Sequence, residues 1–228
     1  MRVQQVEPDG NCLYRSLACA LIHVFTGKNV GKGAPWGSEK NIGDIFQNAV
    51  MQWIRVLVAH RLATGMPLRA DTEFDGKSLF SVLMRMNKLL KKHQTSAKLK
   101  SRTAARHIMR KLKPTLPRLK PTDEGRMSVY PCGLTADDLS LSGRGEHESF
   151  QKYCRRIHSR GSWGGEAECY VASLVLCLPV CVYQKFEKVI CYNADGARKV
   201  PLTIAFVNGE HYDAILGSEF PPLFHQKL

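Results

Sequence analysis

The sequence lacks the cysteine density and the cysteine spacing of a disulfide scaffold or a zinc ribbon. Eight cysteines in 228 residues are far fewer than a disulfide-stapled scaffold contains, and no two of them form a Cys-x-x-Cys pair. These absences argue against a disulfide framework and against a zinc ribbon. The simplest interpretation is a set of free thiols in a reducing compartment. This predicts a cytoplasmic protein, although the nucleus would satisfy the same condition.

A long apolar run is also missing. The most apolar stretch, residues 169–183, is fifteen residues long and is broken by Pro179, whereas a membrane-spanning helix needs about 20 residues. Residues 12–25 are apolar too, but Arg15 interrupts them and no small-residue cleavage site follows. The sequence therefore predicts neither a transmembrane segment nor an export signal.

One stretch of the chain lacks both acidic and aromatic residues. Residues 85–122 include thirteen lysines and arginines but no Asp, Glu, Phe, Trp or Tyr, so this stretch accounts for the whole net charge of +13. Any contact with a polyanion, such as RNA, DNA or an anionic membrane, is therefore assigned to residues 85–122 and is expected to be non-specific. The competing interpretation is a solvated loop, because Pro114, Pro117 and Pro121 prevent regular structure.

The overall composition excludes several classes of protein. Hydrophobic residues make up 44% of the chain and charged residues 23%, which are ordinary globular values and exclude wholesale disorder, collagen and coiled coil. We predict a single domain over residues 1–228, with a basic insertion or arm at about residues 88–145.

Hydrophobic periodicity predicts helices in the first part of the chain. Apolar residues at helical spacing predict a helix that begins near Cys12 and two more over residues 42–57 and 79–90. Residues 165–178 are expected to form a buried helix that ends before Pro179.

The pattern in the last part of the chain predicts β-strands. Four short runs are rich in Val, Ile, Tyr and Phe, and they cover residues 180–184, 188–193, 200–207 and 211–216. Asp195-Gly196 and Asn208-Gly209 are turn signals between them. Helices followed by strands predict an α+β fold, and we expect the strands to form a meander.

Asp9-Gly10-Asn11-Cys12 stands where the first predicted helix begins. Helix dipoles favour negative charge at the N-terminus, so a cysteine there can lose its proton near neutral pH and act as a nucleophile. Gly10 allows the loop a backbone shape that residues with a Cβ resist. Backbone N–H groups of this loop would then form an oxyanion hole for an incoming carbonyl.

His211 and Asp213 directly follow the Asn208-Gly209 turn. Residues two apart on a strand project from the same face, so the carboxylate can orient the imidazole. With Cys12 they would form a Cys-His-Asp triad, in which the imidazole takes the thiol proton and later returns it to a leaving amine. Each residue alone has an ordinary alternative, because cysteine is commonly buried filler and a strand histidine is commonly structural. Core filler is also the interpretation of Cys169, Cys177, Cys181 and Cys191.

Three blocks of the sequence resemble the OTU (ovarian tumour) family of cysteine proteases. Residues 9–17 (DGNCLYRSL) look like the family's nucleophile motif, and residues 163–168 (WGGEAE) resemble its second block. Residues 209–213 (GEHYD) resemble the block at the catalytic histidine, and the three blocks follow the family's order along the chain. The resemblance implies a papain-like α+β fold with a helical N-terminal part and a C-terminal, mostly antiparallel sheet.

The resemblance also implies an activity and residue roles. It implies hydrolysis of isopeptide bonds after the Gly-Gly tail of ubiquitin or a ubiquitin-like modifier, with a thioester as the intermediate. The sequence shows no sign of a cofactor. Carried over by position, Cys12 is the nucleophile, His211 the general base and Asp213 its orienting partner. Asp9 is assigned to shaping the oxyanion loop with Gly10 and Asn11, which is compatible with its alternative as a turn residue.

The second block has two interpretations. Trp163 and Gly164 are expected at the channel that threads the Gly-Gly tail, and a core tryptophan is the equal alternative. Glu166 and Glu168 either meet basic groups near the substrate tail or, as we prefer, supply favourable charge at a helix N-terminus.

Two other functions compete with the deubiquitinase. Met1 lies only eight residues before Asp9, so the domain is either a minimal version of the family or a piece of a larger polypeptide. In the latter case it could be a viral OTU-like protease that processes its own polyprotein. The remaining hypothesis is an inactive relative, or a basic adaptor that binds nucleic acid.

Overall fold

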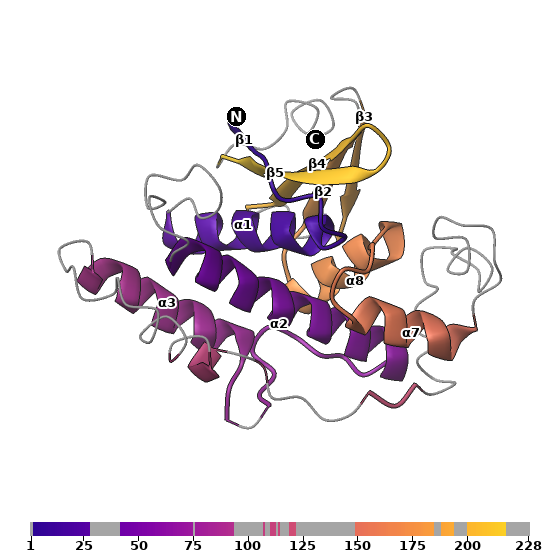
Figure 1. Cartoon of the computed structure of the whole chain (residues 1–228), viewed down its shortest axis with the longest axis horizontal. Helices are drawn as coiled ribbons and strands as arrows, with labels where there is room; N and C mark the ends of the chain where they lie inside the picture. Colours follow the sequence, from indigo (N-terminus) through magenta and orange to yellow (C-terminus); the bar gives the residue numbers. More distant parts are fainter. Residues whose placement is uncertain are drawn as a thin grey trace.

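Helices occupy most of the first part of the chain and strands the last, as hydrophobic periodicity predicts, but a short strand at Arg2–Gln4, which was not predicted, precedes the first helix. The computed structural model describes residues 2–27, 42–74, 76–93, 149–184, 188–193 and 200–217, with positions 107, 110–112, 114 and 119–121. A five-stranded sheet lies on one side of the molecule and the helices are layered against it (Figure 1). The α+β expectation is confirmed.

The three helices predicted in the first part of the chain are present. They are α1 (Cys12–Thr26), α2 (Ile42–Thr64) and α3 (Leu79–His93). Residues along most of α1 are buried on all sides, because this helix lies between the sheet and α2 (Figure 1). The layer order explains why the first helix is apolar all round while α3, on the outside, is amphipathic.

Two helices lead from the middle of the chain to the sheet. Helix α8 (Glu166–Leu176) matches the expected buried helix. Helix α7 (Phe150–His158) was not expected; its N-cap Ser149 accepts a hydrogen bond from the Lys152 N–H. Its apolar side consists of Phe150, Tyr153, Cys154 and Ile157 among basic neighbours. These four residues have helical spacing, so the sequence did contain a signal for this helix that was not used.

The sheet is mixed, so the meander expectation is wrong. Its order is β1-β5-β4-β2-β3, and it comprises β1 (Arg2–Gln4), β2 (Val180–Gln184), β3 (Lys188–Tyr192), β4 (Leu202–Val207) and β5 (His211–Leu216). Strand β4 runs parallel to β2 instead of pairing with β3, while the other three pairs are antiparallel. The burial patterns explain the order: β4 is mostly buried and takes an interior place, whereas β3 is partly exposed and lies at an edge.

Cys181 and Cys191 face each other across β2 and β3 and form a disulfide. The expectation of free thiols and core filler is therefore wrong for these two residues. The sequence could not show their pairing, because it depends on the register of the hairpin. Cys12, Cys19, Cys154, Cys169 and Cys177 are free, and Cys132 lies outside the described residues.

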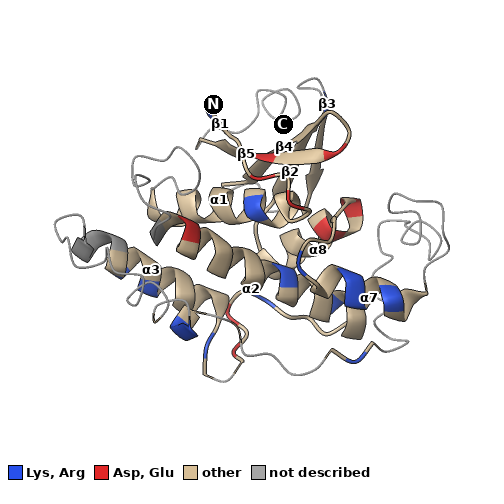
Figure 2. Cartoon of the chain, viewed as in Figure 1, with Lys and Arg blue, Asp and Glu red and all other residues tan. Residues whose placement is uncertain are grey.

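Most of the predicted basic insertion lies outside the described residues. One described part of it packs in the core: Leu112 has 1% of its surface exposed, and its carbonyl accepts a 2.7 Å hydrogen bond from Trp53 Nε1. Basic side chains of the described residues are prominent along α7 (Figure 2). Within the described ranges, every helix is too short or too polar to cross a bilayer.

Candidate active site

The loop that precedes α1 is held in shape by its own side chains. Gly10 has φ +72°, a left-handed conformation that favours glycine. The Asn11 N–H donates to Asp9 Oδ1 at 3.1 Å, and Asn11 Nδ2 donates to the Asp9 carbonyl at 3.2 Å. Asn11 is the N-cap of α1, but its side chain makes no capping bond to the helix. Its oxygen accepts hydrogen bonds from outside α1 instead.

Asp9 is ion-paired with Arg15, one turn into α1. Arg15 Nη2 donates to Asp9 Oδ2 at 2.6 Å, and Arg15 Nε lies 3.1 Å from Asp9 Oδ1. Partial burial opposes ionisation of Asp9, but the hydrogen bonds from Arg15 and Asn11 outweigh it and lower its pKa to about 2. The carboxylate is therefore charged at neutral pH, and its hydrogen bonds to Arg15 and Asn11 hold the loop in place.

Cys12 is the first residue of α1 and only 3% of its surface is exposed. Burial raises the pKa of its thiol, while hydrogen bonds to the sulfur from the backbone N–H groups of Tyr212, Leu13 and Cys12 itself act in the opposite direction. The expectation that the helix N-terminus ionises this thiol near neutral pH is wrong for the resting protein, because desolvation outweighs the backbone N–H groups.

His211 and Asp213 form the expected pair at the start of β5. His211 Nε2 lies 3.0 Å from Asp213 Oδ1, and 7% of Asp213 is exposed. The same carboxylate oxygen accepts a 3.0 Å hydrogen bond from the Val6 N–H. Because Nε2 is occupied by the carboxylate, Nδ1 is the imidazole nitrogen left to exchange a proton with substrate or thiol.

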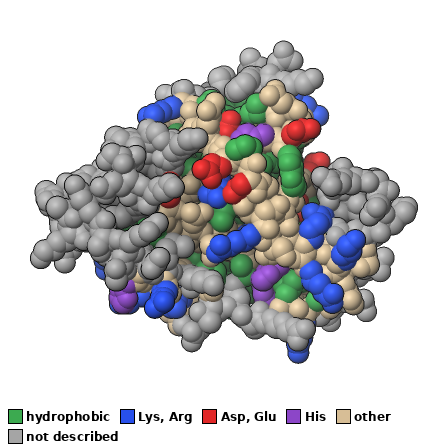
Figure 3. All heavy atoms as spheres, in the orientation of Figure 1, with side chains coloured by type: hydrophobic (Ala, Val, Ile, Leu, Met, Phe, Trp, Pro, Cys, Tyr) green, Lys and Arg blue, Asp and Glu red, His purple; other side chains and the backbone are tan. Residues whose placement is uncertain are grey.

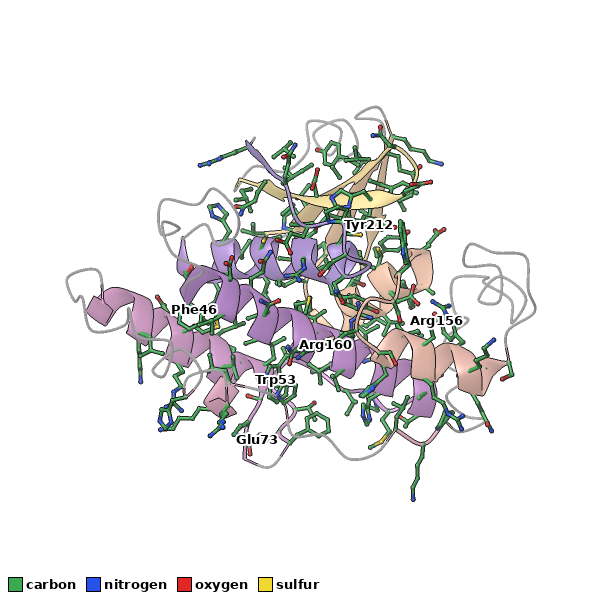
Figure 4. The ribbon with its side chains drawn as sticks, viewed as in Figure 1. Phe46, Trp53, Glu73, Arg156, Arg160 and Tyr212 are labelled. Atoms are coloured by element: carbon green, nitrogen blue, oxygen red, sulfur yellow. A yellow bond between two sulfur atoms is a disulfide. The ribbon has the colours of Figure 1, made fainter. Side chains whose placement is uncertain are left out.

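The fold brings the start of α1 to the start of β5. Ser16 Oγ donates to the Tyr212 carbonyl at 2.9 Å across 196 residues of sequence, and the backbone N–H of Tyr212 lies close enough to the Cys12 sulfur to lower the pKa of the thiol. Tyr212 itself lies between the sheet and α8 (Figure 4). Cys12 and His211 are not hydrogen bonded to each other in the described part of the chain. The sulfur therefore lies beside the residue that follows the histidine.

The second block of the sequence, residues 163–168, lies against α1. Trp163 is 52% exposed, so the core interpretation of this tryptophan is wrong. A Cβ at Gly164 would approach Leu13 Cδ2 to 2.5 Å, so glycine is needed there for close packing. Glu168 is buried, accepts hydrogen bonds from Gly165 N–H and Tyr153 Oη, and completes the N-terminal cap of α8. This arrangement agrees with the preferred of the two interpretations, in which these glutamates supply favourable charge at a helix N-terminus.

Three contributors to the site were not found from the sequence. Arg15 anchors Asp9, Val6 donates to Asp213, and the buried Arg55 reaches Asn11 from α2. Asp9 lies in the loop before α1 and six residues from Arg15, so helical spacing does not reveal this pair; opposite charges within one short motif were the only signal in the sequence. Within the described residues no group of His, Cys, Asp or Glu is arranged to hold a metal ion.

On the face of the molecule in Figure 3, acidic, basic and histidine side chains lie close together where the sheet meets the helices. Basic side chains also gather at the lower right, over α7. The surface around the site thus carries both signs of charge.

Comparison with known proteins connects this site to one family. The profile of a family described as OTU-like cysteine protease matches residues 74–212, more than half of the chain. The match includes His211, whereas Cys12 lies before it and Asp213 directly after it. The family match therefore stands independently of the nucleophile motif.

Curated relatives match a short part of the chain. An ovarian tumor domain-containing deubiquitinating enzyme 4 of Arabidopsis thaliana is 34% identical over 73 residues, which are 29% of this chain and 23% of that protein. The deubiquitinase OTUD6B of Homo sapiens is 32% identical over 73 residues, 30% of this chain and 25% of that protein. The chain thus spans about a quarter of the length of these relatives. A solved ovarian tumor (OTU) domain in complex with ubiquitin aligns over 93% of this chain and 67% of that one, at 15% identity and a TM-score of 0.38.

Proposed function

Because the chain belongs to the family of OTU-like cysteine proteases, we propose that it is a deubiquitinase. It would hydrolyse the isopeptide or peptide bond after the Gly-Gly tail of ubiquitin or a ubiquitin-like modifier. The names of the curated relatives support this substrate class. The single observation that carries the proposal is that Cys12, at the start of α1, lies beside the backbone of Tyr212, the residue between His211 and Asp213 at the start of β5.

The first chemical step is attack by Cys12. His211 Nδ1 takes the proton from the Cys12 thiol, and the sulfur bonds to the carbonyl carbon of the terminal glycine. The imidazolium then gives that proton to the leaving amine, and the carbon–nitrogen bond breaks to leave a thioester. In the second step, His211 takes a proton from water as the water oxygen attacks the thioester carbon. The carbon–sulfur bond then breaks, the C-terminal carboxylate of the modifier leaves, and the imidazolium returns the proton to the Cys12 sulfur. Asp213 stabilises the charged imidazole throughout.

Backbone N–H groups at the start of α1 stabilise the oxyanion. The N–H groups of the first helical residues have no intrahelical acceptor, and that of Cys12 lies beside the sulfur. The Asn11 N–H is already bonded to Asp9. In our proposal Cys12 supplies an oxyanion donor, and Asp9, Gly10 and Asn11 hold the loop that presents it.

Trp163 and Gly164 line the substrate channel in this proposal. The exposure of Trp163 supports that role, because an exposed indole offers an apolar wall for a narrow Gly-Gly tail. Gly164 packs against Leu13, which keeps this segment close to the nucleophile helix.

An electrophilic ubiquitin probe tests the proposal. Ubiquitin with a C-terminal propargyl amide should form a covalent adduct with the native chain and with Cys19→Ala, but not with Cys12→Ala. Cys19 is the matched control, because it also lies buried in α1 and its pKa is raised by burial to about 12. His211→Asn should lower the rate of ubiquitin-substrate hydrolysis roughly a thousandfold or more, and Asp213→Ala noticeably less.

The panel of modifiers decides between the competing functions. If neither ubiquitin nor any ubiquitin-like probe forms an adduct, the deubiquitinase proposal is wrong. Cleavage of a precursor that contains the chain would then favour polyprotein processing, and absence of all cleavage would favour an inactive adaptor.

We propose a second, separate contact: non-specific binding of polyanions through residues 85–122. The charge of this stretch supports it. Since Leu112 is in the core, the test should neutralise charges and avoid deleting the stretch. Replacing Lys98, Lys100, Arg102 and Arg106 with Gln should abolish a salt-sensitive RNA gel shift. An unchanged shift would contradict the proposal.

A further inference from the structure

Arg55 lies in the interior of the molecule, within α2, with 1% of its surface exposed. Its guanidinium lies over the ring of Tyr14, 4.1 Å from the ring centroid. Among the described residues no carboxylate lies within ion-pair distance of it, although Glu168 and Asp9 favour its charged form from further away. Burying a charge without an ion-pair partner is costly in free energy. The hydrogen bonds of Arg55 must therefore account for its burial at this position.

Four hydrogen bonds connect Arg55 to three segments of the chain. Nη1 donates to the carbonyls of Ile157 and Ser159, both at 2.8 Å, where α7 ends. Nη2 donates to the Ser162 carbonyl at 3.0 Å and to Asn11 Oδ1 at 2.9 Å. One side chain therefore ties the loop before the nucleophile to the turn that follows α7.

The loop and the turn also touch through their backbones. A Cβ at Gly10 would come within 2.2 Å of the Gly161 carbonyl oxygen, and the Gly161 N–H donates to Asn11 Oδ1 at 2.9 Å. Asn11 Oδ1 thus receives one N–H from the turn and one from Arg55. Any shift of the turn is passed directly to the residue before Cys12.

Arginine is suited to this place for two reasons. Its planar guanidinium presents five N–H donors in a fixed geometry, and neither lysine nor an uncharged residue can reproduce that pattern. The carbonyls at the end of α7 also carry the negative end of the helix dipole, which favours a cation there.

We propose that Arg55 is a positioning residue, which holds the Asp9–Asn11 loop against the 159–162 turn and so sets the relation between Cys12 and Trp163. This inference rests on the proposed function and adds a residue that touches none of the reacting atoms. The predicted consequence of losing it is a misplaced nucleophile in a folded protein.

The experiment compares Arg55→Lys with Arg61→Met, measured per folded molecule. Arg61 is the control, because it is also an α2 arginine that donates to a backbone carbonyl, that of Leu68, away from the site. Arg55→Lys should lower kcat on a ubiquitin substrate about tenfold to a hundredfold with little change in KM, because small misplacements of reacting groups have effects of that order. Arg61→Met should leave kcat within about twofold of the native value.

A readout that does not depend on ubiquitin separates this inference from the proposed function. Arg55→Lys retains the positive charge, so a change in the rate of Cys12 alkylation by iodoacetamide reports on position and exposure. We expect alkylation to become about fivefold faster as the buried thiol is exposed, with no change in Arg61→Met. A native protein that is inactive on every modifier would contradict the proposed function, and the alkylation rates would still decide the role of Arg55.

If Arg55→Lys also lowers the stability of the protein, a double-mutant cycle with Asn11 tests the proposal. If Arg55 acts through Asn11, then Asn11→Ala and Arg55→Lys should each lower kcat, and the double variant should lose far less than the product of the two single losses. Losses that multiply would overturn the proposal, as would an Arg55→Lys protein whose kcat and alkylation rate match the native values.

Discussion

At the scale of single residues, burial governs the reactivity of Cys12. Because burial raises the pKa of the thiol, the thiol is protonated at neutral pH in the free protein, and its thiolate fraction increases with pH. We expect alkylation by iodoacetamide to accelerate about tenfold per pH unit between about pH 6 and pH 8, as measured by mass spectrometry of the Cys12 peptide. A flat rate over this range would mean that the thiolate is already formed, and would contradict the prediction.

His60 makes the stability of the protein depend on pH. It is buried in α2 and its Nε2 has no hydrogen-bond partner; burial, and then the neighbouring His158, lower its pKa to about 4. In the unfolded chain it takes up a proton near its ordinary pKa of 6.5, so acid favours unfolding as pH falls from 6.5 towards 4. Stability is fully present above this window and lost within it.

Replacing His60 with Leu should remove this dependence. Between about pH 7 and pH 5, the unfolding free energy of His60→Leu should fall by about 2 kcal/mol less than that of the native protein. Urea unfolding at both pH values measures the difference. The exposed His107 provides the control, since His107→Leu should behave like the native protein; equal losses in all three proteins would refute the role of His60.

At the scale of secondary-structure elements, β1 supports the carboxylate of Asp213. This three-residue edge strand pairs with β5 through Gln4 and Ala214, and the chain continues to Val6, whose N–H donates to Asp213 Oδ1. Hydrogen bonds to charged groups contribute roughly 1.5–3 kcal/mol. The segment before the nucleophile loop therefore belongs to the site.

Val6→Pro tests this contribution, because proline has no N–H to donate. We expect kcat to fall about tenfold or more, while Val6→Ala, which retains the N–H and loses only methyl groups, should stay close to the native value. Circular dichroism confirms that both variants fold. Equal kcat values for the two variants would show that the Val6 N–H is dispensable.

At the scale of the whole molecule, the site and the disulfide lie towards opposite edges of one sheet. Strand β5 carries His211 next to the β1 edge, whereas Cys181 and Cys191 join β2 to the far edge strand β3. The two features are separated by β4, so reduction should affect stability and not chemistry.

Reducing agent is the test of this separation. A disulfide that closes a loop of this size stabilises a protein by up to about 3 kcal/mol, so dithiothreitol should lower the unfolding free energy, as should Cys181→Ala with Cys191→Ala. Formation of the electrophilic-ubiquitin adduct should be unaffected by reduction. An adduct rate that changes in the double variant would link the hairpin to the site.

The motifs show where sequence reasoning succeeded. Residue type and spacing made Cys12, His211 and Asp213 candidates, and the resemblance to the OTU family selected them. The fold brings the cysteine beside the residue after the histidine. Their catalytic roles stay predictions until the variants are measured. The starts of α1, α2, α3 and α8 were also predicted to within one residue, because apolar stripes at helical spacing mark them, whereas α2 extends beyond its predicted end and α7 was missed.

The misses share a physical cause. Arg55 donates to backbone carbonyls, and Val6 donates through its backbone N–H. Because nearly every residue has a backbone carbonyl and N–H, no pattern of residue types predicts these contacts. The parallel pairing of β2 with β4 and the Cys181–Cys191 disulfide depend on which strands become neighbours. The order of the strands depends on how the whole sheet is buried, and a short stretch of sequence does not contain this information.

The sequence by itself determined the α+β class, the family and the side chains able to do thiol chemistry, because these depend on composition, period and short motifs. Only the tertiary structure decided that the thiol is buried with a raised pKa, that Val6 serves Asp213, and that Arg55 joins the nucleophile loop to the turn after α7. Desolvation and hydrogen bonding depend on distances between groups far apart in the chain, and folding alone sets those distances.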